Sequence, residues 1–393
     1  MAEVNEAVDE ITQTGSVWDG VETPPPYIVP DYDRTLEHDI VIVRRIVVIS
    51  LTLILLSAVV YVGGIFLGEN GLVGYRPADS ALDSQEIYAD LVQFDDDELT
   101  GKGVRVCIVD SGLEPNHPDL DNLGITLWKD FVLDRPDAYD DEGHGTSMTG
   151  ILVADGWMKG IAPNVELLVA KALSQDGSGS DEVVAEAIDW CAANSADIIS
   201  LSLGGAPGIL PFSFGGGRSS EDASNDAINQ GIFVVAAAGN DGGDDDDGDV
   251  ASPCSVRNVI CVGGVTQSGT HWSGSSTGDN NGRLLPFLLP RSDPNKKPEV
   301  VAPAQSVAVI NNQGSWSLVY GTSAATVYVT GALALLLENN PELSNSTSEA
   351  NIQQVKQWIQ QSSLPAEGQT DHDDDYGYGL LQIKELINAA NQQ

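Results

Sequence analysis

The chain has 393 residues, 42% of them hydrophobic, and its 58 acidic against 18 basic residues give a net charge of −40. This length and apolar content suffice for one large core with appendages, or for two ordinary domains. So negative a charge repels nucleic-acid phosphates, which excludes a nucleic-acid partner.

The acidic residues are spread along the chain, with clusters at 95–97, 244–247 and 373–375. Few basic residues and a diffuse acidic surface indicate a protein from a halophile, whose high salt screens the repulsion. An acidic interaction surface is the alternative, although such a surface is usually concentrated in one tail.

The N-terminal region predicts a tail followed by a membrane helix. Residues 1–43 lack a sustained apolar period and are expected to form an acidic, flexible tail. Residues 46–67 carry no charge, and as a helix they would span about 33 Å, enough for the ~30 Å core of a bilayer. We therefore predict a transmembrane signal-anchor helix over 44–68, with 46–67 in the membrane. A cleavable signal peptide fits less well, because the run is long and starts far from Met1.

The basic residues near this helix predict its orientation. Arg34, Arg44 and Arg45 precede the span, and only Arg76 follows closely. Because lysine and arginine accumulate on the cytoplasmic side, the N-terminus should be cytoplasmic. The chain is then a single-pass protein of the cell membrane, with everything after Gly68 extracellular.

Residues 69–100 are expected to form an acidic connector, and residues 101–393 a folded domain. Short apolar runs recur in this domain, and two helical patterns lie between them. The runs are 104–109, 165–170, 196–203, 232–238 and 259–262, and the helical patterns are 181–194 and 219–230. Apolar strands alternating with helices predict an α/β domain of three layers, in which helices cover both faces of a mostly parallel central sheet.

The four cysteines are too few for a disulfide scaffold. Cys107 and Cys191 lie in apolar segments and are expected in the core. Cys254 and Cys261 can pair across a turn if the domain faces an oxidising compartment, and the sequence leaves that open.

Three segments carry candidate catalytic residues. Asp110 ends the first apolar run, where a doubly wound sheet gathers its chemistry, although Asp-Ser-Gly is also ordinary turn sequence. His144 stands between two glycines, which expose a side chain, and no second histidine has the spacing of a metal ligand. Ser323 lies where a long apolar helix begins, so it is either a nucleophile beside unpaired N–H groups or part of a helix cap.

The order Asp110, His144, Ser323 is the order of the subtilisin triad. Residues 101–390 resemble a subtilisin-like serine protease domain, of the subtilase family. The motifs that carry the resemblance are Asp110-Ser-Gly with His117-Pro-Asp-Leu120, Gly143-His-Gly-Thr146, Gly160-Ile-Ala-Pro163, Ser200-Leu-Ser-Leu-Gly-Gly205, Ala236-Ala-Ala-Gly-Asn240, Lys297-Pro-Glu-Val-Val-Ala-Pro303, Gly321-Thr-Ser323 and Tyr378-Gly-Leu-Leu381.

The resemblance implies a role for each candidate. Ser323 would attack a peptide carbonyl, His144 would carry its proton to the leaving amine, and Asp110 would orient the imidazole. Asn240 would donate its side-chain amide to the oxyanion, although before Asp241-Gly242 it could also be a turn residue.

The resemblance also implies where substrate binds. Ser202, Leu203 and Gly204 would run beside the peptide backbone, with Gly179 on its other side and Ala238 and Gly239 close to the oxyanion. Backbone hydrogen bonds to two extended edges allow broad side-chain selectivity. Glu142 and the acids of 241–249 could favour a basic substrate residue, or they could be solvating acids of a halophile.

The chain departs from the family pattern in several places. Ala324 stands where the family usually has Met, and Val327 where it usually has Pro. The segment 151–163 lacks the asparagine-rich loop that binds calcium in many relatives, so calcium is possible but no cofactor is expected to be required. About 32 residues precede the domain after the span, fewer than the usual folding-assistant propeptide needs. The apolar loop 284–290 and the glycosylation sequon at Asn345 are further features of this domain.

The sequence thus predicts a membrane-anchored extracellular serine endopeptidase acting on protein or peptide substrates, with neither a metal nor a small-molecule cofactor. The alternative is a catalytically weak relative that serves as a membrane-anchored binding or scaffold module. A soluble protease released by cleavage within 69–100 is a third possibility.

Overall fold

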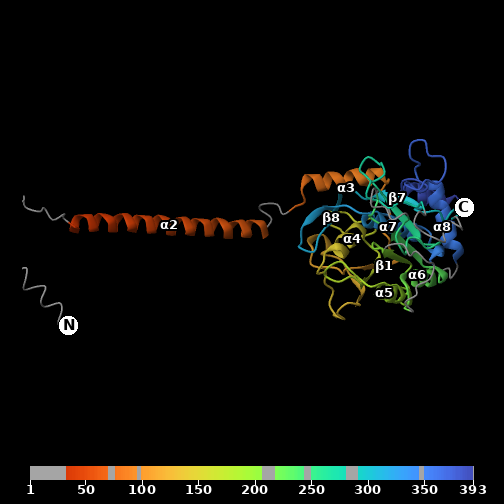
Figure 1. The fold of residues 1–393 in the computed structure, drawn as a ribbon, viewed down its shortest axis with the longest axis horizontal. Coiled ribbons are helices and arrows are strands. Elements are labelled where there is room, and N and C mark those ends of the chain that lie inside the picture. Colours follow the sequence, from red (N-terminus) through yellow and green to blue (C-terminus); the bar gives the residue numbers. More distant parts are fainter. Residues whose placement is uncertain are drawn as a thin grey trace, which may run out of the picture. The chain divides into compact units, whose positions relative to one another are not determined.

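A computed structural model of the chain describes residues 32–69, 76–94, 99–205, 217–242, 249–279, 291–344 and 349–392. The acidic runs 95–97 and 244–247, the loop 284–290 and Asn345 lie outside these residues. The chain divides into two units, residues 1–75 and residues 76–393, each described by itself below (Figure 1).

The first unit contains one long helix, α2 (Tyr32–Glu69). Its segment His38–Gly64 has a mean hydropathy of 2.6 and no buried residue, so it is long and apolar enough to cross a membrane by length and composition. A signal sequence would have the same properties. The helix begins earlier than the expected 44–68, and assigning 32–43 to a flexible tail was wrong. No proline follows Pro30 before the helix ends, so helix propagation from the apolar segment continues unbroken.

The second unit is built on a parallel sheet. Within the described residues the sheet has seven strands, in the order β2-β3-β1-β4-β5-β6-β7, and all neighbours are parallel. The strands are β1 (Arg105–Asp110), β2 (Ile125–Asp130), β3 (Glu166–Lys171), β4 (Ile198–Leu201), β5 (Phe233–Ala237), β6 (Ile260–Val265) and β7 (Val300–Pro303). The five expected strands are present, which confirms the α/β prediction; β2 and β7 were not expected as strands.

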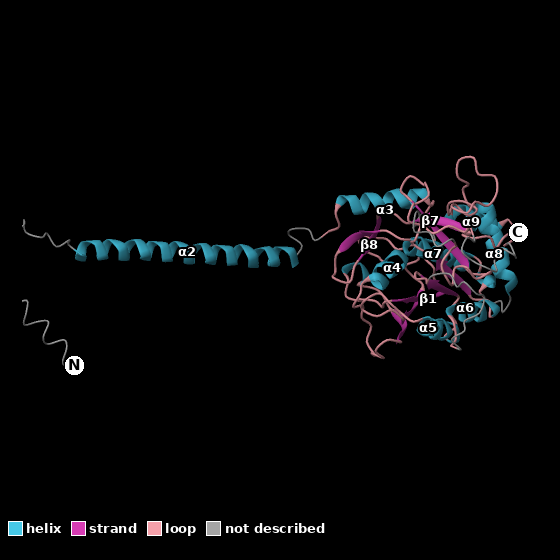
Figure 2. Cartoon of the chain, viewed as in Figure 1, coloured by secondary structure: helices cyan, strands magenta, loops and turns pink. Residues whose placement is uncertain are grey.

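Helices cover both faces of the sheet. The chain passes from β2 to β3 through α4 (His144–Val153), and from β4 to β5 through α6 (Ser220–Asn229). The helices gather in two separate pairs. The helix α7 (Thr322–Asn339) packs on α4, and α5 (Asp181–Ala193) packs on α6, as Figures 1 and 2 show.

The remaining elements lie around these layers. They are α3 (Asp79–Leu91), the short 3-10 helices η1 (Pro118–Leu120) and η4 (Pro341–Leu343), the hairpin β8 (Val307–Ile310) with β9 (Trp316–Val319), α8 (Glu349–Ser362) and α9 (Ile383–Asn391). The core is continuous from β1 to α7 and α9.

The helix α3 corrects the expected connector. Residues 69–100 were assigned to an acidic linker, but Ala81, Ser84 and Tyr88 of α3 are buried. The Tyr88 hydroxyl bonds to the carbonyl of Gln305, and Ser84 Oγ donates to the carbonyl of Ser306 at 2.5 Å. The folded unit therefore begins at residue 76, six residues after α2 ends.

All four cysteines are paired. Cys254 is bonded to Cys261, the pairing that the sequence left open. Cys107 of β1 is bonded to Cys191 of α5, which the sequence did not predict because both residues read as core side chains. Both bridges are buried.

Candidate active site

The first catalytic candidate, Asp110, is the last residue of β1 and is fully buried. The strand order reverses at β1, since one neighbour is β3 and the other β4, and sites form at such switch points. Gly112 follows with φ +119°, and a Cβ there would lie 2.1 Å from the carbonyl oxygen of Tyr139. Only glycine therefore allows the chain to turn here and leave the Asp110 carboxylate facing α4.

His144 is the first residue of α4 and contacts Asp110. Its Nδ1 lies 2.8 Å from Asp110 Oδ1 and 3.0 Å from Oδ2. A Cβ on Gly145 would meet the Gly112 carbonyl oxygen at 2.2 Å, so this glycine lets the helix start approach the turn after β1. With Nδ1 bonded to a carboxylate, the proton is on Nδ1 and Nε2 is free to accept one.

The charge around His144 favours its protonated form. Burial of the ring opposes protonation, but the charge of Asp110 and its hydrogen bond outweigh burial, and Glu142 and Asp140 add to them. Together they raise the pKa of His144 to about 9. A pKa this high makes the imidazole a strong base that is neutral only in alkaline solution.

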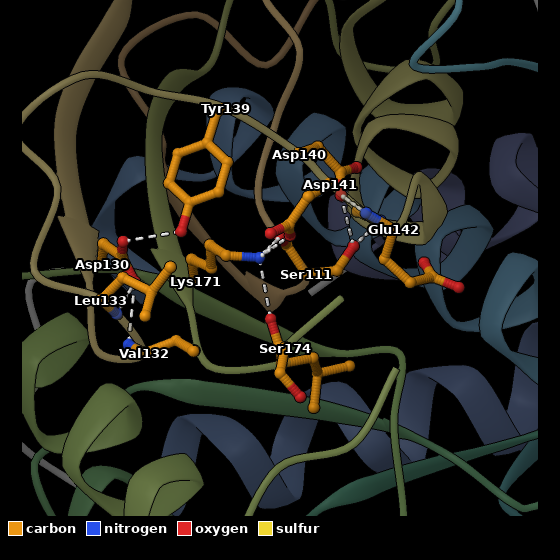
Figure 3. A network of polar contacts seen from close by, with 12 residues as sticks. Ser111, Asp130, Val132, Leu133, Tyr139, Asp140, Asp141, Glu142, Lys171 and Ser174 are labelled. Carbon is orange, nitrogen blue, oxygen red and sulfur yellow. Dashed lines mark hydrogen bonds and ion pairs between the residues drawn. The ribbon is translucent and has the colours of Figure 1, made fainter. Parts of the chain in front are cut away.

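Asp140 fixes the start of α4 and was not predicted from the sequence. Its Oδ1 accepts from Ser111 Oγ at 2.9 Å (Figure 3) and from Gly143 N at 2.8 Å. Its Oδ2 accepts from Thr146 N at 2.8 Å and from Thr146 Oγ1 at 2.6 Å. Burial opposes ionisation, but these donors outweigh it and lower the pKa of Asp140. An ionised carboxylate thus ties the turn after Asp110 to the helix that carries His144.

Lys171 supports the same turn from β3. Its side chain is fully buried, and Nζ donates to the Ser111 carbonyl at 2.5 Å, to Asp141 Oδ1 at 2.7 Å and to the Leu173 carbonyl at 2.9 Å (Figure 3). The ammonium also lies 4.9 Å from the centre of the Tyr139 ring. The sequence analysis did not predict this residue. The signal that could have found it is a lysine at the end of an otherwise apolar run.

Ser323 is the second residue of α7. Its Oγ donates to the Ser202 carbonyl at 2.9 Å, and Ser202 Oγ donates in return to the Ser323 carbonyl at 3.1 Å. Within the described residues the hydroxyl of Ser323 is thus bonded to the segment after β4, and not to His144.

Asn240 follows β5 and is held by the start of α7. Its Oδ1 accepts from Thr322 N at 2.9 Å and from Thr322 Oγ1 at 3.1 Å. Since a backbone N–H can only donate, the atom facing it is the amide oxygen, and Nδ2 is the atom left for another partner. The side chain is exposed, so Nδ2 can serve a bound ligand.

These residues share a cleft of about 1220 Å³. The residues predicted for the site that line it are His144, Gly179, Ser202, Leu203, Gly204, Gly239, Asn240 and Ser323. Asp110 is buried behind His144. Ala238 was expected on the substrate surface, but it is fully buried and its backbone bonds to Val262 and Ala251, so Ala237 lines the cleft instead.

The two departures from the family pattern that follow Ser323 lie in the core. Ala324 and Val327 are buried at 1% and 0% exposure, and neither lines the cleft. Among the residues that the structure covers, no group of three or more His, Cys, Asp or Glu is arranged to hold a metal ion.

Comparison with known proteins shows the family of this chain. The family model Peptidase_S8, described as the subtilase family, matches residues 101–379. Subtilisin E of Bacillus subtilis (strain 168) is 29% identical over 289 residues, which are 72% of this chain and 66% of that protein. Subtilisin Savinase of Lederbergia lenta is 31% identical over 250 residues, 63% of this chain and 81% of that protein.

A solved structure agrees with the fold. Sphericase matches with a TM-score of 0.60 and 26% identity, over 75% of this chain and 96% of that chain. The chain spans 66% of the length of Subtilisin E. It belongs to the subtilase family, whose model spans residues 101–379.

Proposed function

We propose that this chain is a serine endopeptidase that hydrolyses peptide bonds through an acyl-enzyme. The observation that carries this proposal is the Asp110–His144 contact in a cleft that also contains Ser323 and the oriented amide of Asn240. Base, nucleophile and oxyanion donor are the parts that acyl transfer requires.

In the acylation half, Ser323 Oγ attacks the scissile carbonyl carbon while its proton passes to His144 Nε2. Asp110 holds the imidazole by Nδ1 and stabilises the imidazolium that forms. The carbonyl oxygen becomes an oxyanion, which accepts from Asn240 Nδ2 and from the N–H of Ser323, unpaired in the first turn of α7.

The second half returns the enzyme to its starting state. The intermediate collapses to an ester on Ser323, and the C–N bond breaks as His144 gives its proton to the leaving amine. A water molecule then attacks the ester, its proton passes to His144, and the acid product leaves as Ser323 recovers its proton.

A catalytically weak binding or scaffold protein is the competing function, and the hydrogen bond from Ser323 Oγ to Ser202 favours it, because the nucleophile is turned from its base. A fluorophosphonate probe in molar salt tests the two, with Ser323→Ala as the control. The peptidase should label at Ser323 and the control should not. Folded wild-type protein that fails to label would reject the enzyme.

We further propose that α2 anchors the domain in the cell membrane with the catalytic unit outside. The apolar segment His38–Gly64 supports an anchor, and two buried disulfides support an oxidising compartment. After carbonate extraction the full-length chain should remain with the membranes. A soluble chain whose N-terminus lies after residue 69 would instead identify a signal sequence or a released protease.

We also propose that the protein comes from a high-salt cell, supported by its net charge of −40, and that calcium is not required. Self-repulsion is screened as salt rises. The melting temperature should therefore climb between about 0.1 M and 1 M KCl, where the Debye length falls from about 10 Å to 3 Å. Adding a calcium chelator in molar KCl should leave it unchanged.

A further inference from the structure

The substrate cleft is lined by carboxylates. Glu142, Asp181, Glu221 and Asp222 line it together with the nucleophile, and among its described lining residues the one basic side chain is His144. Glu142 Oε2 already accepts from the backbone N of His144 at 2.6 Å. The acids at the other end of the cleft belong to the starts of α5 and α6.

Glu221 is the acid whose position is fixed. Its Oε1 accepts from Ser252 Oγ at 2.8 Å and from Ser255 Oγ at 3.4 Å. Ser252 is in turn paired with Gly205 by two backbone hydrogen bonds of 3.0 Å each. The second oxygen, Oε2, has no hydrogen-bond partner among the described residues, so an oriented carboxylate oxygen is available to a ligand.

Glu221 lies within reach of a substrate residue bound near Ser323. Ser202, which contacts Ser323, and Gly205, which pairs with Ser252, are the two ends of one edge of the cleft. They are three positions apart in the sequence, which corresponds to about 10 Å for an extended chain. A long side chain of a substrate residue near the scissile bond can therefore end at Glu221.

In the part of the chain that the structure describes, no neighbouring cation neutralises this end of the cleft. Arg218 precedes α6, but its guanidinium is bonded to Asp189 at 2.5 and 2.7 Å and to Asp226 at 2.7 Å, and it does not line the cleft. The flanking segments 206–216 and 243–248 contain no lysine or arginine in their sequence. An unneutralised carboxylate in a cleft attracts a cation.

We propose that Glu221 is a specificity-determining residue, which binds the ammonium or guanidinium of a lysine or arginine near the scissile bond. This inference rests on the proposed peptidase function and names its substrate class. The alternative, that the acids only solvate a halophilic surface, predicts no discrimination between lysine and its uncharged acetylated form.

The test uses pairs of quenched peptides, in which one peptide has lysine and the other has acetyl-lysine at the same position. This position is varied from pair to pair around one cleavable bond. At one of these positions lysine should give a kcat/KM at least about tenfold higher, as expected for a charge-assisted hydrogen bond. Glu221→Gln should abolish that difference. Glu86→Gln on α3, an exposed acid outside the cleft, is the matched control and should retain it.

Equal kcat/KM for the two peptides in wild type, or a preference that survives Glu221→Gln, would overturn the inference while leaving the peptidase intact. Failure to cut any peptide, together with no labelling by fluorophosphonate, would remove both proposals. Wild-type protein gives a check that needs no variant: benzamidine should inhibit competitively at least about tenfold better than neutral benzamide. Equal inhibition by the two would also count against Glu221 as a cation site.

Discussion

The side-chain oxygen of Asn240 accepts hydrogen bonds from the backbone N of Thr322 at 2.9 Å and from Thr322 Oγ1 at 3.1 Å. Thr322, the residue before Ser323, therefore orients the side-chain amide of Asn240. Thr322 Oγ1 also donates to the Gly239 carbonyl at 3.1 Å, which fixes the segment that carries Asn240.

We expect Asn240→Leu to lower kcat by about 10²–10³-fold with little change in KM, the size of effect known for the asparagine donor of a subtilisin. Thr322→Val keeps the backbone donor and loses only the hydroxyl, so kcat should fall by about tenfold. Steady-state kinetics measure both. A larger effect on KM than on kcat would show that Asn240 binds ground-state substrate instead.

Because the pKa of His144 is raised, we expect kcat/KM to be highest in alkaline solution. Because the base must be neutral to accept the Ser323 proton, kcat/KM should rise with pH and level off above the pKa of about 9. In Asp110→Asn the negative charge is lost, so the midpoint should move down toward the ordinary value of 6.5, and the plateau should fall by about 10⁴-fold. An unchanged midpoint in this variant would mean that Asp110 does not set the pKa.

The same pair makes stability depend on pH. The pKa of His144 is higher in the folded chain than its ordinary 6.5, so its stabilising contribution is complete below about pH 6.5 and is lost as the pH rises through about 9. Urea unfolding of wild type should show this loss in that window. Asp110→Asn should show a smaller change over the same range.

Removing Lys171 should destabilise the fold. Lys171→Met would leave the carbonyls of Ser111 and Leu173 and the carboxylate of Asp141 without their buried donor, at a cost of about 3 kcal/mol. Lys159→Met is the matched control, because its ion pair with Asp155 is exposed and contributes less than about 1 kcal/mol. Urea unfolding compares them, and equal losses would contradict a structural role for the buried ammonium.

The two disulfides should differ in their effect on unfolding. Cys107 and Cys191 are 84 residues apart, whereas Cys254 and Cys261 are 7 apart. By loop-closure entropy the first bridge contributes about 4.5 kcal/mol and the second about 2.4 kcal/mol. Paired Cys→Ala variants test this by urea unfolding, and since all four side chains are buried, loss of packing is similar in both. A larger loss for the short loop would rule out the entropic explanation.

The sequence predicted those parts of the fold in which burial is continuous. The run 104–109 and strand β1 differ by one residue, because a strand covered on both faces is apolar throughout. Strand β2 was missed because it is an edge strand, half buried, with Thr126 and Lys129 interrupting the apolar pattern. Helix α3 was missed because two of its three buried residues are Ala81 and Ser84, which give no apolar period.

Some residues of the candidate site could be predicted from the sequence and others could not. Asp110, His144 and Ser323 are found in short motifs, which the sequence displays directly. Lys171 and Glu221 act through contacts with residues 60 and 31 positions away, namely Ser111 and Ser252. Such contacts depend on how β3 and α6 pack, which local patterns do not contain. The orientation of Ser323 toward Ser202 likewise depends on a contact across 121 residues.

The chain between α2 and the folded unit is short. Residues 70–75 are six in number, and even fully extended they reach only about 21 Å. A chain that retains α2 therefore keeps the folded unit tethered to it by a short segment. If a bilayer held this helix, the proposed proteolysis would be confined to the layer of solution next to the membrane surface. In that layer the domain would meet neighbouring membrane proteins far more often than proteins of the bulk solution.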